Sequence, residues 1–516
     1  MITENQEIKQ PIIPKNVFHI TDFGAIGNGM YDNTNVFQVV MKKIQEVGGG
    51  KVIVPAGIWL TGPIQLVSKL NLHFEDGAIL LFSSNFDQYP LILSSFEGEE
   101  TIRCRSPLDG EELEDVAITG SGVIDGSGSA WRPVKRYKMT EMQWEQLINS
   151  GGIVDEEGEV WWPSEQALKG KQVFQQLRNS GSRNVEDFKY IKDFLRPNLV
   201  SLRRCKRILL DGPTFQNSPA WCVHPWVCEQ ITIKNITVRN PWFSQNGDGL
   251  DVESSRFGLI EDCIFDVGDD AICIKSGKDE AGRLLGVPCE HITIRRCQVY
   301  SGHGGFVIGS EMSGGVRDIT ISDCSFFGTD VGLRFKSTRG RGGVVENIYV
   351  DRITMNDIKN EAIVFQMFYE LEGEKVLTDE KVTEKTPIFR NITITNVLCT
   401  GAQTAIKMKG LPEMPLQNIN FTNITISSFE GICCSECVEL SFSNVKLNIK
   451  NGPLTQLENC KQVVLDQVIS TEPLNSFLNI TGNKNITVKG ERIKEGDFVS
   501  VSNEVDSNEL KLIKSQ

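Results

Sequence analysis

One eight-residue pattern recurs along the chain and limits the folds that it can adopt. Two apolar residues flank a variable one, a polar pair follows, and two more apolar residues flank a second variable position. Alternation with a period of two is typical of a half-buried β-strand, and the polar pair interrupts it. A shortened copy covers Leu259–Phe265. The full copies are Ile231–Val238, Ile292–Val299, Ile319–Phe326, Ile348–Met355, Ile392–Cys399, Ile419–Ile426 and Leu440–Leu447.

The spacing of these copies indicates a solenoid. Those at residues 292, 319 and 348 begin 27 and 29 residues apart, and those at 419 and 440 begin 21 residues apart. Most copies are not separated by a helix of about 10–15 residues, so a doubly wound α/β sheet does not fit. Leucine-rich repeats do not fit either, because the Leu-x-x-Leu-x-Leu frame is missing. The sequence therefore predicts an all-β fold, a parallel β-helix whose coils stack about 4.8 Å apart.

The segments around the repeats are expected to complete one domain over residues 17–490. One helix is predicted from Asp32 or Asn33 to about Val47, where three glycines stop it, and it should cover the exposed edge of the first coil. Residues 126–197 break the repeat with two helical stretches, 139–149 and 166–179, and are predicted to be an insertion near an active-site cleft. Residues 1–16 are then an N-terminal extension, and residues 491–516 are a polar C-terminal tail.

Charge and composition exclude several classes of protein. The 53 basic and 67 acidic residues give a net charge of −14, which would repel the phosphates of nucleic acid. No apolar run approaches the ~20 residues of a membrane-spanning helix. No apolar leader precedes Pro14, so a periplasmic or secreted location requires a leader that was trimmed, and a cytoplasmic one does not. The 14 Cys lack the spacing of a disulfide framework. Cys263, Cys297 and Cys324 share one repeat position and are expected to stack inside.

Four short polar motifs occur in consecutive coils and are candidates for chemistry. Each follows the one before it by 21 to 33 residues, about one coil, so all four are expected to lie on one face of the solenoid. The motifs are Asn246-Gly247-Asp248, Gly268-Asp269-Asp270, Gly302-His303-Gly304 and Arg334-Phe335-Lys336.

Strand alternation predicts which side chains of these motifs point outward. Arg334 and Lys336 are expected on the outer face, with Phe335 between them in the core. Asn246 and Asp248 are expected to share a face in the same way.

Together the motifs would bring three carboxylates close to one histidine and two cations. Crowded carboxylates cannot all ionise easily, so one should hold a proton near neutral pH and divide the group into an acid and a base. A glycosidase needs such a division. The cations suit a substrate that carries its own carboxylate, because arginine binds carboxylate through two hydrogen bonds and lysine binds it as a point charge.

Each motif alone has an ordinary structural interpretation. Two aspartates after a glycine are common in turns, and Arg-x-Lys on a strand is usually a solvated face. The order of the four motifs, one coil apart, is what indicates a functional site.

These motifs, in this order, resemble the signature of glycoside hydrolase family 28, the polygalacturonase family of right-handed parallel β-helices. The resemblance extends from near the N-terminus to about residue 470 and is greatest to bacterial exo-acting members. It also includes Phe23–Gly27, Gly120–Gly126, Asn217–Pro225 and His303–Arg317.

The resemblance implies roles for the acidic motifs. Asp269 is similar to the general acid, and Asp248 and Asp270 are similar to the pair that activates water. His303 resembles the residue that supports the protonation of the acid, and Asn246 resembles a substrate-binding residue. The implied reaction is hydrolysis with inversion, for which acid and base usually lie roughly 6.5–9.5 Å apart.

The resemblance also implies how substrate is bound. Arg334 and Lys336 are similar to a carboxylate-binding pair, and Tyr369 to a substrate-contacting tyrosine. No metal or cofactor is implied, and the oligomeric state is left open. The chain departs from the family at Gly247, where many fungal members have Thr. It also departs at Val252 and Ser255, where close bacterial relatives have Pro and Cys, and these two positions could alter which sugar is accepted.

The implied function is exo-acting hydrolysis of α-1,4-galacturonosyl linkages in homogalacturonan or its oligomers, with release of galacturonic acid. One alternative is another activity of the family, on rhamnogalacturonan or pectin side chains, or an endo-polygalacturonase. Another is a pectate lyase that holds Ca²⁺ with its aspartates. A non-catalytic β-helix that binds glycan is a further alternative, which the three acidic residues argue against.

Overall fold

The computed structural model describes residues 8–370, 380–472, 476–482, 484–489, 499–501 and 510–513. The predicted extension 1–16 and tail 491–516 lie partly outside these residues. The chain divides into two compact units, Met1–Cys273 and Ile274–Gln516, and strand β25 (Asp270–Lys275) contains the boundary. Both units consist mainly of parallel strands, as the repeat predicted. Among the helices of the described residues, none has the length and apolar character that crossing a membrane requires.

Unit 1 is built from coils of three short strands, and each strand pairs in parallel with its counterpart in the next coil. One face has β6 (Leu70–Phe74), β11 (Glu114–Gly120), β17 (Lys206–Asp211), β20 (Glu229–Lys234) and β23 (Arg256–Glu261). The next has β7 (Ala78–Phe82), β12 (Val123–Asp125), β18 (Thr214–Gln216), β21 (Thr237–Arg239) and β24 (Ile264–Asp266). The third has β5 (Ile64–Gln65), β10 (Leu108–Glu111), β16 (Val200–Arg203), β19 (Val223–Trp226) and β22 (Leu250–Glu253).

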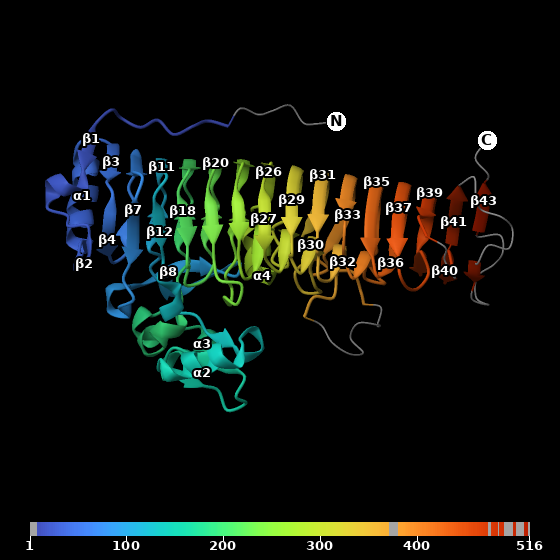
Figure 1. Ribbon diagram of the computed structural model, residues 1–516, viewed down its shortest axis with the longest axis horizontal. Coiled ribbons are helices and arrows are strands. Elements are labelled where there is room, and N and C mark those ends of the chain that lie inside the picture. Colours follow the sequence, from blue (N-terminus) through green and yellow to red (C-terminus); the bar gives the residue numbers. More distant parts are fainter. Residues whose placement is uncertain are drawn as a thin grey trace. The chain divides into compact units, whose positions relative to one another are not determined.

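The N-terminal end of unit 1 contains the predicted helix. Helix α1 (Thr34–Glu46) begins after Asn33 and ends before Gly48, whose φ is +80°. Its buried face includes Phe37, Val40 and Ile44, and Figure 1 shows α1 beside the first strands of the unit. These strands are β1 (Val17–His19), β2 (Asn28–Asp32), β3 (Gly50–Val54) and β4 (Gly57–Thr61). The helix therefore covers the first coil, as predicted.

Between β12 and β16 the chain leaves the coils and forms two small apolar clusters. Helices α2 (Glu141–Asn149) and α3 (Glu165–Asn179) match the two predicted helical stretches to within two residues, and they lie together in Figure 1. A hairpin of β8 (Leu91–Phe96) and β9 (Glu99–Cys104) packs against this segment, together with η2 (Phe86–Gln88). The remaining elements are η3 (Gly128–Ala130), β13 (Val134–Lys135), η4 (Arg136–Lys138), β14 (Ile153–Val154), β15 (Val160–Trp162) and η5 (Val185–Phe194). A further turn, η1 (Ile20–Phe23), precedes β2.

Unit 2 continues the parallel pattern with longer strands. One face has β26 (Cys289–Arg295), β27 (Gln298–Ser301), β29 (Val316–Phe327), β31 (Val344–Asn356), β33 (Ile388–Cys399), β35 (Leu416–Ser428), β37 (Cys437–Ile449), β39 (Lys461–Ser470), β41 (Lys484–Lys489) and β43 (Leu510–Ile513). The other has β28 (Gly304–Ile308), β30 (Val331–Lys336), β32 (Glu361–Gln366), β34 (Thr404–Lys409), β36 (Glu430–Ser435), β38 (Thr455–Glu458), β40 (Leu478–Thr481) and β42 (Val499–Val501). Helix α4 (Asp279–Leu285) precedes them.

The polar pair of the repeat marks a sharp bend in each coil. Its second residue has a positive φ in every copy, for example +57° at Asn423 and +54° at Asn396. Asparagine tolerates this left-handed conformation better than other non-glycine residues. The side chains also form a ladder, since Asn444 Nδ2 donates to Asn423 Oδ1 over 2.8 Å, and Asn423 Nδ2 donates to Asn396 Oδ1 over 3.0 Å.

The cysteines are free and almost all buried, as predicted. In unit 2 the backbone N–H of Cys297 points at Cys324 Sγ over 3.4 Å, which confirms that these two thiols lie in adjacent coils. Cys263 is buried in unit 1.

Candidate active site

Three carboxylates lie together in unit 1. Asp248, Asp269 and Asp270 each place one oxygen within 4.8 Å of the others, and we call them the carboxylate group. Asp248 is only 3% exposed, and Asp270 begins β25. Oxygens at this spacing could hold a cation as well as a water molecule or a sugar hydroxyl. The gap of roughly 6.5–9.5 Å expected between acid and base is not present between these oxygens.

A loop of residues 240–249, rather than a strand, holds Asp248. Asn240 is buried and donates from Nδ2 to the carbonyl oxygen of Gly247 over 3.1 Å, and its Oδ1 accepts from the N–H of Ser218 over 2.8 Å. The N–H of Gly249 donates to the carbonyl of Asp270 over 2.9 Å, which links the two acidic motifs. Strand alternation therefore does not determine where Asn246 and Asp248 point, and the sequence argument for a shared face does not apply.

Two glycines let the acidic motifs approach each other. A Cβ on Gly247 would lie 1.8 Å from Ser244 Oγ, and a Cβ on Gly268 would lie 2.4 Å from the same oxygen. Neither distance is possible between real atoms without movement of the backbone. Thr at position 247 would not fit this loop as it stands, because its Cβ would meet Ser244.

Arg196 connects the segment between β12 and β16 to this loop. It donates from Nη2 to Asn246 Oδ1 over 2.8 Å, and from Nη1 to the carbonyl oxygens of Pro219 and Gln245 over 3.0 and 2.9 Å. Asn246 itself has a φ of +53°. The side-chain oxygen of Asn246, predicted to bind substrate, is therefore occupied by a guanidinium.

Three arginines crowd this part of unit 1. Removal from solvent lowers the pKa of both Arg103 and Arg132 to about 9, and the neighbouring charge of Arg196 contributes in each case. Removal from solvent also lowers the pKa of Arg196, to about 10, although Glu97, Asp248 and Asp269 pull it upward. Asp248 and Asp269 therefore have a cationic neighbour, Arg196, that the sequence did not reveal.

The predicted cations of unit 2 lie together on β30. The guanidinium carbon of Arg334 is 5.7 Å from the ring centre of Tyr369, and Lys336 Nζ is 4.8 Å from it, which are distances of cation–π contact. Phe335 points the other way and stacks on Phe365, with ring centres 4.2 Å apart. The predicted alternation is confirmed, and we call Arg334, Lys336 and Tyr369 the cation group.

A buried carboxylate lies beside the cation group. Glu311 Oε2 is 3.3 Å from Lys275 Nζ, and its Oε1 is 3.8 Å from Arg341. Although burial raises the pKa of Glu311, the charges of Lys275, Lys336 and Arg341 hold it well below its usual value. Glu311 thus offsets part of the positive charge of its neighbours, and Arg341 also pairs with Asp279, with 2.6 Å between Nη1 and Oδ1. Cations gathered in this way suit an anionic ligand.

His303 lies in the turn before β28 and is half-buried. Its Nε2 is 3.8 Å from Asp330 Oδ2, an ion pair when the ring is protonated. Lys359 Nζ also contacts Asp330, over 3.1 Å. The sequence analysis did not single out Asp330 as a partner of the histidine.

The two departures near the acidic motifs are internal to the scaffold. Val252 is 1% exposed and Ser255 is fully buried. Ser255 Oγ accepts from the N–H of Cys228 over 2.9 Å and contacts the carbonyl of Glu253 over 2.8 Å. Both residues therefore belong to the scaffold, and their effect on which sugar is accepted stays a prediction.

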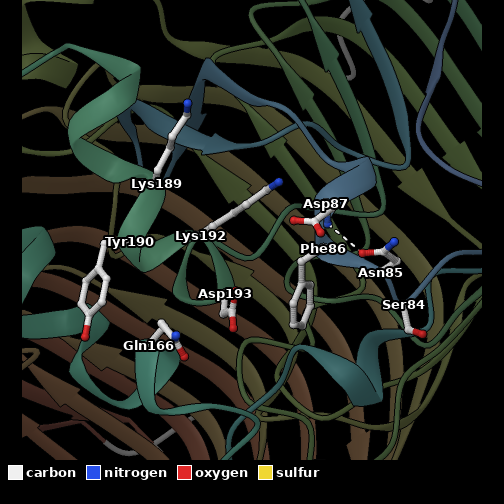
Figure 2. A pocket seen from close by; sticks show the side chains of 9 residues that line it. All are labelled: Ser84, Asn85, Phe86, Asp87, Gln166, Lys189, Tyr190, Lys192 and Asp193. Atoms are coloured by element: carbon white, nitrogen blue, oxygen red, sulfur yellow. Dashed lines mark hydrogen bonds between the residues drawn. The ribbon is translucent and has the colours of Figure 1, made fainter.

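A pocket of about 470 Å³ opens beside η5, away from every predicted site residue (Figure 2). Figure 2 shows lysines on one side and the Asn85–Asp87 turn on the other. Its lining is Ser84, Asn85, Phe86, Asp87, Gln166, Lys189, Tyr190, Lys192 and Asp193. Two lysines and two aspartates line it, so positive and negative side chains are balanced here.

Comparison with known proteins now assigns the family. The model of glycosyl hydrolases family 28 matches residues 135–447. The chain belongs to this family. It is therefore a glycosidase, and the resemblance inferred from the four motifs is confirmed.

Individual relatives agree. A probable polygalacturonase of Vitis vinifera is 31% identical over 418 residues, which are 79% of this chain and 73% of the relative. An exo-poly-alpha-D-galacturonosidase of Dickeya chrysanthemi is 24% identical over 455 residues, 85% of this chain and 72% of the relative. A solved exopolygalacturonase of Thermotoga maritima has a TM-score of 0.71 and 32% identity, covering 86% of this chain and 94% of its own. The predicted right-handed parallel β-helix is confirmed.

Sequence reasoning missed several residues that support the predicted ones. Arg196 is 50 residues from Asn246 in the chain, and no local motif marks it. Asn240 and Glu311 carried a weak signal, because both lie within short polar stretches near a named motif. A buried polar side chain that serves the backbone of a loop has no sequence pattern of its own.

Proposed function

We propose that the protein hydrolyses α-1,4-galacturonosyl linkages of homogalacturonan or its oligomers. The observation that carries the proposal is the presence, in one member of a glycosidase family, of a carboxylate group and of a cation group. Carboxylates supply the acid and base of glycoside hydrolysis, and the cations match a sugar that carries a carboxylate. Relatives named as polygalacturonases support this substrate.

In the proposed reaction Asp269 protonates the leaving oxygen, while Asp248 and Asp270 orient the attacking water and take its proton. Asp269 also accepts a hydrogen bond at Oδ1 from the N–H of Asp270 over 3.0 Å, which fixes its orientation. His303 supports the protonated form of the acid.

Substrate recognition is assigned to the cation group. Arg334 and Lys336 bind the carboxylate of the galacturonate, and Tyr369 packs over both cations and contacts the sugar ring. Asn246 contributes through its amide nitrogen, because its oxygen already accepts from Arg196.

We propose that cleavage starts at a chain end. The segment between β12 and β16 would form the wall that closes the binding cleft, and the exo-acting names of two relatives support this mode. An endo-acting enzyme of the family is the alternative.

Product analysis tests these proposals. The protein is incubated with unsubstituted polygalacturonic acid in the presence of a chelator, and the products are followed over time by anion-exchange chromatography. Monogalacturonic acid alone from the first time points supports the exo mode, and a ladder of oligomers would replace it with the endo mode. Products with a double bond, or a loss of activity to the chelator, would indicate a lyase that needs Ca²⁺. No product from this polymer, but release from branched pectin, would move the substrate to rhamnogalacturonan or side chains.

Proton NMR of the first product tests the stereochemistry. Inversion of an α-linkage gives the β-anomer first, and retention gives the α-anomer first. This measurement matters here because the carboxylate oxygens lie closer together than in most inverting enzymes.

A further inference from the structure

We propose that Arg196 is a positioning residue of the hydrolytic reaction. It holds the loop that carries Asn246 and Asp248, and it places a positive charge beside Asp248 and Asp269. The inference rests on the catalytic roles proposed for these two aspartates.

The hydrogen bonds of Arg196 all reach the chain around the carboxylate group. Its acceptors are the carbonyl of Pro219, the carbonyl of Gln245 and the side chain of Asn246, at 2.8–3.0 Å. Gln245 and Asn246 lie three and two residues before Asp248, so one guanidinium fixes two consecutive residues of the loop. A planar fork of donors suits this task, and the compact ammonium of a lysine could not reach three acceptors in the same geometry.

The backbone of Arg196 is itself anchored, which makes the side chain a rigid support. Arg103 donates to the carbonyl oxygen of Arg196, and the N–H of Cys104 donates to the carbonyl of Leu195 over 3.1 Å. Both donors lie at the end of β9. Strand β9 and η5 thus hold the root of the side chain, and its tip holds the catalytic loop.

The charges around Arg196 show why it matters for chemistry. Arg103 and Arg132 repel it, whereas Glu97, Asp248 and Asp269 attract it. Asp248 and Asp269 belong to the carboxylate group. Three crowded carboxylates repel one another, and a fixed cation at their side reduces the cost of keeping the base ionised.

Arg132 shows what a purely structural arginine looks like in the same region. It is 2% exposed, and it donates to the carbonyl of Ser218 and to Asn217 Oδ1. These two acceptors belong to residues 217 and 218 and not to the loop of residues 240–249. A role limited to capping carbonyl oxygens would therefore be common to both arginines, whereas an effect on turnover should belong to Arg196 alone.

The test compares Arg196→Lys and Arg196→Gln with the wild type and with a control, Arg207→Gln. Arg207 is also half-buried and also makes several hydrogen bonds, but its partners are the exposed Glu114 and the buried Asp115, neither of which belongs to the carboxylate group. Turnover of polygalacturonic acid is measured per mole of folded protein, with the folded fraction taken from thermal unfolding and circular dichroism.

We expect Arg196→Gln to lower kcat about 100-fold with KM within about twofold of wild type, because both the charge and the fork are lost. Arg196→Lys keeps the charge and should lower kcat only about 10-fold. Arg207→Gln should leave both parameters unchanged.

Three results would overturn the inference while leaving the proposed function intact. They are a folded Arg196→Gln with wild-type kcat, a loss confined to KM, and an equal loss in Arg207→Gln. If Arg196→Gln does not fold, Arg196→Lys is judged by the same criteria. The inference is overturned if Arg196→Lys has wild-type kcat or if it also fails to fold. A wild-type protein without any glycosidase product would instead count against the proposed function.

Discussion

The carboxylate group and the cation group are held in place in different ways. The cations Arg334 and Lys336 lie on strand β30, whose alternation places both on one face and Phe335 in the core. Asp248 lies in a loop, and its position depends on Asn240 and on Arg196, neither of which is its neighbour in the sequence.

A strand therefore positions functional side chains by its own geometry, whereas a loop needs support from other parts of the chain. We expect the cation group to tolerate changes in its surroundings and to respond mainly when a cation itself is replaced. The carboxylate group should respond both to changes in its members and to changes in the residues that support the loop. The predictions below test this difference.

The largest effect should come from Asp269→Asn. The amide cannot donate a proton to the leaving oxygen, so we expect kcat to fall about 1,000-fold with little change in KM. Steady-state kinetics on polygalacturonic acid measure this. Asp266→Asn is the matched control, because Asp266 is exposed and lies three residues away on β24. Equal activity of Asp269→Asn and wild type would show that Asp269 is not the acid.

Lys336→Met should have its main effect on binding. Loss of the point charge weakens attraction for the galacturonate carboxylate, and we expect KM to rise about 30-fold. On a methyl-esterified substrate, which carries no carboxylate charge, Lys336→Met and wild type should have similar KM values. Lys407→Met on β34 is the control, since Lys407 pairs with Glu361 instead. A fall in kcat with unchanged KM would mean that Lys336 acts in the chemical step, as proposed for the carboxylate group, and not in binding.

The sequence predicted the features held by strands better than those held by the loop. The strand pattern correctly gave the parallel coils, the direction of Phe335 and the buried thiols, because a period of two is a local property of the chain. Helices α2 and α3 were also predicted from local signals, and their N-caps Thr140 and Ser164 each accept a backbone hydrogen bond.

The support of the loop of residues 240–249 could not be predicted in this way. Arg196 and Asn246 meet only because the chain returns to the same place after leaving the coils. The positive φ in each polar pair was also not foreseen, although the frequent Asn and Asp at its second position were a usable signal. Val252 and Ser255 are buried, which agrees with the scaffold position expected for them.

Gly247→Ala tests the position of the loop by adding one methyl group, without changing any charge. The new Cβ would lie 1.8 Å from Ser244 Oγ, so the loop must move and Asp248 with it. We expect kcat to fall about 10-fold, because small displacements of reacting groups are costly. The double variant Gly247→Ala/Ser244→Gly removes the atom in conflict and should recover most of the activity. Failure of this recovery would mean that the glycine is needed for another reason.

The smallest effect should be a change in stability at the ion pair between Asp115 and Arg207 in unit 1. Hydrogen bonds from Arg207 are the main cause that lowers the pKa of Asp115. Burial raises this pKa by less than those hydrogen bonds lower it, and the N–H of Ile12 lowers it further. Asp115→Asn should lower the free energy of unfolding by about 1 kcal/mol at pH 7, because the exchange keeps an acceptor for Ile12 but loses the ion pair.

This loss should depend on pH in one direction only. The folded state keeps Asp115 ionised to lower pH than the unfolded state does, whose pKa is about 3.9. The ion pair therefore adds its full contribution above that value, and the contribution disappears as the pH falls through the lower folded-state pKa. Urea unfolding of wild type and Asp115→Asn should differ at pH 7 and converge in acid, while kcat at pH 7 stays equal. A difference that persists unchanged in acid would mean that Asp115 stabilises the coil by packing instead of by charge.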